Sequence, residues 1–244
     1  MAKQKGDGAA KEHAGHPTIV AIGASAGGVG ALQRFFANIP ERTGAAYVVV
    51  VHLDPDRPSE LAPILKARTQ MPVVQVQEEA KLEADHVYVI PPGRMLQITD
   101  HRLSATPFSE PRGQRSPVDH LFRSLAERLG DGFAVILSGA GSDGALGVRA
   151  VKEAGGIILV QDPAESEYPS MPRSAIASGI ADVVLPVADL AARLGDLIRM
   201  KHSNDGAISK IDEDLLRRVL AHLRVRTGHD FSKRCCAGSR GACR

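Results

Sequence analysis

The chain contains 244 residues, of which 43% are hydrophobic and 24% charged, a balance that excludes a disordered chain or a membrane-embedded one. The formal net charge is +2 and the basic residues are spread along the sequence, so we expect no nucleic-acid-binding surface. No apolar stretch is long enough for membrane insertion, and the cysteines, Cys235, Cys236 and Cys243, all lie near the C-terminal end. We therefore expect a cytoplasmic protein without disulfides or a cysteine metal site in its core.

From residue 18 onwards, short apolar runs alternate with amphipathic segments. The predicted strands are 18–22, 46–51, 73–76, 87–90, 132–137, 157–160 and 182–184. The predicted helices are 28–38, 59–69, 118–129, 143–154, 172–178 and 188–200. Repeated strand and helix units of this kind favour an α/β fold with a parallel sheet.

Two regions depart from this alternation. Residues 87–98 read as a strand, a turn at Pro91-Pro92-Gly93 and a returning strand, which predicts an antiparallel edge, and residues 106–115 read as a surface loop. Residues 201–206 are polar and predict a linker, which is followed by a helical stretch over 211–226.

The strongest local motif is the segment Gly23-Ala24-Ser25-Ala26-Gly27-Gly28, which follows an apolar strand and opens a helix. It matches the G-x-S-x-G pattern, in which glycines permit a tight turn and leave a serine hydroxyl exposed. Backbone N–H groups at the start of the next helix could then stabilise an oxyanion. The alternative is a glycine turn in which Ser25 only caps the helix.

A serine nucleophile needs a histidine base, and His52 is the best placed of the nine histidines. It follows the strand 46–51, one strand-helix-strand unit after Ser25, so both residues should emerge at the carboxyl edge of a parallel sheet. His86 precedes its strand and should lie at the opposite edge. The alternative is that His52 is an ordinary residue at a strand end.

The glycine-rich segment 138–144 follows another predicted strand, and it places Asp143 at the same carboxyl edge. Asp54 is a local rival, although a carboxylate so close to His52 in sequence should face solvent, and Asp143 could also be a simple helix cap. Three strand ends that supply serine, histidine and aspartate predict a triad for acyl transfer.

Several motifs in a fixed order make residues 18–194 resemble the catalytic domain of the chemotaxis methylesterase CheB. These motifs are 22–28, 51–53, 89–93, 116–119, 137–144, 161–162 and 171–172. The resemblance implies an α/β fold with a doubly wound, mostly parallel sheet, helices on both faces and a small antiparallel hairpin at one edge. It also implies hydrolysis of glutamate methyl esters, and deamidation of glutamine, on the cytoplasmic helices of chemoreceptors, with neither a metal nor an organic cofactor.

The same resemblance assigns roles to single residues. It implies that Ser25 is the nucleophile, His52 the general base and Asp143 the residue that orients the imidazole. Ala26 and Ala140 stand where the family usually has threonine and methionine, and their backbone amides are the expected oxyanion donors beside the reacting carbonyl.

For the chain as a whole we expect five parts. These are a disordered tail (1–17), the esterase domain (18–198), a linker (199–209), a helical stub (210–233) and a second disordered tail (234–244). Residues 1–17 leave no room for the receiver domain that chemotaxis members carry. The stub resembles the start of a CheR-type methyltransferase, so we expect a fused esterase–methyltransferase whose reading frame was shifted or cut after Lys233.

Two other functions remain open from the sequence. A nucleotide-dependent oxidoreductase would also use a glycine-rich first turn, but Ser25 occupies the place of its middle glycine, and none of the three tyrosines has a lysine four residues on. A non-catalytic, esterase-like signalling module would fit the altered residues Ala26 and Ala140.

Overall fold

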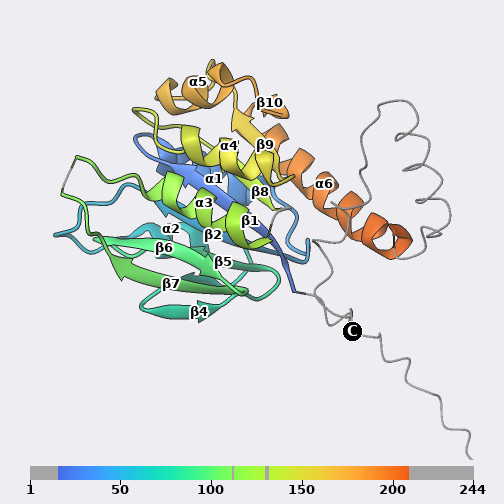
Figure 1. Ribbon diagram of the computed structural model, residues 1–244, viewed down its shortest axis with the longest axis horizontal. Helices are drawn as coiled ribbons and strands as arrows, with labels where there is room; N and C mark the ends of the chain where they lie inside the picture. Colours follow the sequence, from blue (N-terminus) through green and yellow to red (C-terminus); the bar gives the residue numbers. More distant parts are fainter. Residues whose placement is uncertain (1–15, 112, 130–131, 209–244) are drawn as a thin grey trace, which may run out of the picture. The chain divides into compact units, whose positions relative to one another are not determined.

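The computed structural model describes residues 16–111, 113–129 and 132–208 (Figure 1). The strands are β1 (Thr18–Ala24), β2 (Ala45–Val51), β3 (Val73–Gln75), β4 (Glu79–Lys81), β5 (His86–Val89), β6 (Arg94–Thr99), β7 (Arg102–Pro107), β8 (Phe133–Ile136), β9 (Ile157–Gln161) and β10 (Val183–Leu185). The helices are α1 (Gly28–Asn38), α2 (Leu61–Lys66), α3 (Pro117–Leu129), α4 (Ala145–Glu153), α5 (Ser170–Ala177) and α6 (Val187–Ile208).

Seven strands form one parallel sheet in the order β10-β9-β8-β1-β2-β5-β3. The chain starts in the middle at β1, builds outwards through β2, and later returns to place β8 on the other side of β1. The direction of winding therefore changes between β1 and β8, and in such sheets ligands bind at the carboxyl ends of the strands around this point. The predicted doubly wound, mostly parallel sheet is confirmed.

Both faces of this sheet are buried, which explains why its central strands read as continuous apolar runs. Every residue of β2 is buried, and successive residues enter two different cores because side chains alternate along a strand. Tyr47 and Val49 pack into the core under α1, α2 and α6, whereas Val48 and Val50 pack under α3, α4 and α5. Figure 1 shows α3 and α4 in front of the sheet.

The predicted antiparallel element exists, but between other strands. β5 joins the parallel sheet, and β6 instead pairs with β7 in a separate three-stranded sheet, β4-β7-β6, which packs on α3. The tight turn lies at Asp100-His101, where both residues have positive φ angles of 47° and 60°, as a two-residue hairpin turn requires. Residues 91–93 only carry the chain from one sheet to the other. β7 also covers the start of the predicted loop 106–115, and β4 was not predicted.

The last helix is longer than predicted. α6 continues to Ile208 instead of ending at Met200, because the polar residues 201–206 include no proline and Ser203 Oγ donates a hydrogen bond to the Arg199 carbonyl, 2.9 Å away. The compact unit that includes the two sheets ends at Ile198. Residues 1–15 of the predicted tail, the predicted stub 210–233 and the tail 234–244 lie outside the described residues. Within the described ranges, no helix is long and apolar enough to cross a membrane.

Candidate active site

Ser25 follows the last residue of the central strand β1 and precedes α1. The turn depends on Gly27, whose φ of 68° is left-handed, and the Gly28 N–H donates to the Ser25 carbonyl at 2.9 Å. Ser25 is partly exposed, and its hydroxyl makes no hydrogen bond within the described part of the chain. The side chain is therefore available to a ligand at the switch point of the sheet.

His52 follows β2, the strand next to β1. The register pairs Ala24 with Val51, so Ser25 and His52 both come directly after facing residues at the same edge. The His52 side chain is 38% exposed, and its Nε2 atom lies 2.7 Å from Asp143 Oδ2. No hydrogen bond joins Ser25 to the ring in the described ranges, and no described group bonds to His52 Nδ1. His86 begins β5 at the opposite edge, as predicted.

Asp143 lies in the loop between β8 and α4, and only 7% of its side chain is exposed. Besides His52, its carboxylate accepts the Val118 N–H at Oδ2 (3.1 Å) and the Asp119 N–H at Oδ1 (2.9 Å). These two N–H groups belong to the first turn of α3, where they have no partner within the helix. Asp143 therefore caps α3 from a distant segment while it holds the imidazole. The rival Asp54 is half exposed and pairs with Arg57 instead.

Asp119 caps the neighbouring helix in return. Its carboxylate accepts the Gly147 N–H in the first turn of α4 at 2.6 Å. Asp119, which belongs to α3, therefore caps α4, and Asp143, which lies just before α4, caps α3. A Cβ atom on Gly147 would lie 2.6 Å from the Phe122 side chain, which shows how closely α3 and α4 pack. Burial, with the nearby Asp143 charge as a smaller cause, raises the pKa of Asp119 above its ordinary value.

Ser138 and Gly139 tie the remaining loops to the serine turn. Buried Ser138 accepts the Ser25 N–H at its carbonyl (3.0 Å), and its hydroxyl donates to the Ala26 carbonyl (3.0 Å). The same hydroxyl accepts the Tyr168 N–H at 3.0 Å. A Cβ atom on Gly139 would lie 2.0 Å from Met171 Sδ and 3.1 Å from Ser25 Cβ, so the glycine leaves room for Met171 and lets the loop come close to Ser25.

The two predicted oxyanion donors lie next to the contact between Ser25 and Gly139, because Ala26 follows Ser25 and Ala140 follows Gly139 in the chain. Ala26 is partly exposed and Ala140 is exposed. In the part of the chain that the structure describes, neither backbone N–H has a hydrogen-bond partner, so both could donate to a ligand oxygen. Among the described residues, no group of three or more His, Cys, Asp and Glu side chains is arranged to hold a metal ion.

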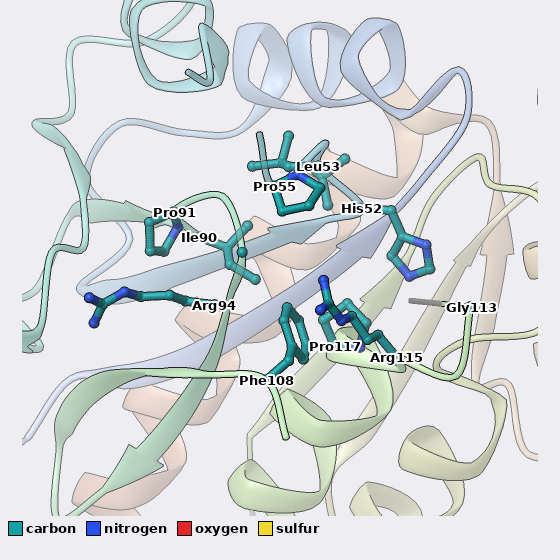
Figure 2. A pocket seen from close by; sticks show the side chains of 12 residues that line it. His52, Leu53, Pro55, Ile90, Pro91, Arg94, Phe108, Gly113, Arg115 and Pro117 are labelled. Atoms are coloured by element: carbon teal, nitrogen blue, oxygen red, sulfur yellow. The ribbon is translucent and has the colours of Figure 1, made fainter. Parts of the chain in front are cut away.

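A cavity of about 280 Å³ opens beside His52 (Figure 2). Its walls are mostly apolar and include Leu53, Ile90 and Phe108, and Arg115 adds a cation. An ester segment next to Ser25 could place flanking groups here.

Sequence reasoning missed two features of this site. One is the capping of α3 by Asp143, which no local sequence motif indicates. Ser116-Pro117 does mark the start of a helix whose first N–H groups need partners. Arg115 and Phe108 fell within the predicted surface loop, and that segment has no periodicity from which a role could be read.

The comparisons with known proteins agree with this architecture. The model of the CheB methylesterase family matches residues 20–194. A protein-glutamate methylesterase/protein-glutamine glutaminase of Burkholderia lata is 38% identical over 190 residues, which cover 74% of this chain and 54% of the relative. An uncharacterized 104.1 kDa protein of Rhodobacter capsulatus is 40% identical over 139 residues, which cover 57% of this chain and 14% of that protein.

The structural comparison gives the same result. The crystal structure of the Thermotoga maritima CheB methylesterase catalytic domain matches with a TM-score of 0.68 and 30% identity, and the match covers 74% of this chain and 98% of that domain. The chain thus spans nearly all of the catalytic domain but only about half the length of the Burkholderia relative. By its sequence, its sheet order and these matches, the chain belongs to the CheB methylesterase family.

Proposed function

We propose that this chain is a protein-glutamate methylesterase that hydrolyses glutamate methyl esters on the cytoplasmic helices of chemoreceptors. Ser25, His52 and Asp143 form its triad. The observation that carries the proposal is the 2.7 Å contact between His52 and Asp143 at the strand ends on either side of Ser25. The names of relatives that share the family domain give the substrate class.

In the proposed reaction, His52 takes the hydroxyl proton of Ser25 as the oxygen attacks the ester carbonyl. Because Asp143 holds Nε2, the nitrogen that receives this proton is Nδ1. The N–H groups of Ala26 and Ala140 donate to the oxyanion, the protonated His52 gives its proton to the leaving methoxide, and methanol departs. Water then hydrolyses the acyl-enzyme. A glutamine side chain would follow the same route with ammonia as the leaving group.

The direct test is the Ser25→Ala variant on a methylated chemoreceptor fragment, with methanol release as the readout. Loss of a triad serine should lower turnover by about 10⁴-fold or more. Ser104→Ala, which removes a hydroxyl from β7, is the matched control and should keep wild-type turnover. A Ser25→Ala variant that keeps most of its activity would show that another group is the nucleophile.

A serine-reactive fluorophosphonate separates the other two candidate functions from an esterase. Wild-type protein that neither reacts with this probe nor releases methanol would support the non-catalytic signalling module. Saturable binding of a nicotinamide dinucleotide in a fluorescence titration would support the oxidoreductase. We expect labelling of wild-type protein, no labelling of Ser25→Ala, and no dinucleotide binding.

A further inference from the structure

Arg115 is fixed in the wall of the cavity beside His52. Its Nε–H donates to the Glu110 carbonyl at 3.0 Å, and its guanidinium lies 4.7 Å from the centre of the Phe108 ring. In Figure 2 the guanidinium lies between Phe108 and His52. Among the described residues, one hydrogen bond and one stacking contact hold the group in place, and no acceptor bonds to either terminal nitrogen.

Among the described residues, no carboxylate lies within ion-pair distance of Arg115, although this residue is partly buried. Three other arginines do form ion pairs: Arg34 with Glu165, Arg57 with Asp54, and Arg102 with Glu79. Arg94 also lines the cavity, but its side chain extends away from His52 and donates to a backbone carbonyl (Figure 2).

From this geometry we infer that Arg115 binds a carboxylate of the substrate close to the ester, so that the enzyme prefers esters flanked by an acidic side chain. This inference rests on the proposed esterase function. A planar guanidinium with free N–H groups fits a carboxylate in a two-point contact, and the low-dielectric wall strengthens the attraction. The ester would lie at Ser25, with the acidic neighbour on the Phe108 side of His52.

The test uses peptides that carry one glutamate methyl ester. In one set a single glutamate stands one to four residues from the ester on either side, and in the matched set glutamine replaces it. The quantity to compare is the ratio of kcat/KM between the acidic peptide and its neutral match. At low salt we expect a ratio of about ten for at least one position in the wild type, and a smaller ratio in high salt.

Arg115→Gln should bring this ratio to within about twofold of one. Arg115→Lys should retain part of it, because lysine keeps the charge but not the planar fork. Arg102→Gln removes the same charge from β7 and should leave the ratio unchanged, and circular dichroism of each variant confirms folding.

Three results would contradict the inference. A wild type that hydrolyses acidic and neutral peptides equally, or an Arg115→Gln variant with an unchanged ratio, would overturn the role of Arg115 and leave the esterase function standing. Hydrolysis of no peptide by the wild type would overturn the proposed function and this inference with it.

Discussion

Replacing Asp143 with alanine should damage the fold as well as the reaction. The substitution removes an acceptor from His52 and from two backbone N–H groups in the first turn of α3. Loss of a helix cap costs roughly 0.5–2 kcal/mol, and a buried donor without a partner costs about 1–3 kcal/mol. Because only 7% of the Asp143 side chain is exposed, we expect the free energy of unfolding to fall by about 2–3 kcal/mol.

His52→Ala is the matched comparison, because it breaks the same hydrogen bond from the other side. The His52 side chain is 38% exposed and caps nothing, so its removal should lower the free energy of unfolding by less than about 0.5 kcal/mol. Both variants should lower kcat by about 10⁴-fold, as expected for loss of a triad member. The two substitutions are thus alike in activity and different in stability.

Urea unfolding followed by circular dichroism measures the stability difference, and methanol release measures the activity. For a protein of this size, a loss of 2–3 kcal/mol lowers Tm by roughly 4–12 °C. Equal stability of Asp143→Ala and His52→Ala would refute the idea that Asp143 caps α3. An active Asp143→Ala variant would refute its role in the triad.

Two further predictions concern the neighbouring elements. The raised pKa of Asp119 means that the folded protein favours the protonated carboxyl group. The stability that this protonated group contributes is complete below the pKa of 3.8 in the unfolded chain, and it is lost as the pH rises through the pKa in the folded chain. Asp119→Asn, which keeps an acceptor for Gly147, should therefore gain stability relative to the wild type between pH 4 and pH 7 in urea unfolding; a difference that does not change with pH would contradict this. In the β6–β7 turn, Asp100→Asn with His101→Gly should raise Tm by about 2–4 °C, because both positions have positive φ and no described residue forms a hydrogen bond with the buried His101 Nδ1. An unchanged or lower Tm in thermal unfolding would contradict it.

The parallel sheet could be predicted because its strands are buried on both faces, and a run such as 45–51 then shows its burial directly in its composition. The same regularity placed Ser25 and His52 at one edge. Strand partners in the small sheet could not be read in this way. β5 lies shortly before β6 in the sequence and β7 shortly after it, so either strand could pair with β6. Only the left-handed turn at Asp100-His101 favours pairing with β7.

The surroundings of the site were harder to predict for a different reason. The contact between Asp143 and α3 joins segments that are separated by 25 residues and meet only in the folded chain. Arg115 lies in an irregular segment, so its direction depends on Phe108 and Glu110 rather than on a helix or strand period. The sequence pattern therefore predicts the position of residues at the ends of helices and strands. It does not predict the position of residues that are held by contacts within loops.

The contacts of Asp143 with both His52 and α3 also bear on how a member of this family could lose the proposed activity. A descendant under no selection for turnover should lose the serine or the imidazole with little effect on stability, whereas loss of the aspartate should destabilise the start of α3. Catalytically dead members should therefore retain the aspartate long after the other two have drifted. Positions 25 and 52 should therefore distinguish active enzymes from non-catalytic members of the family. An aspartate at position 143 alone would indicate only that the domain keeps the fold.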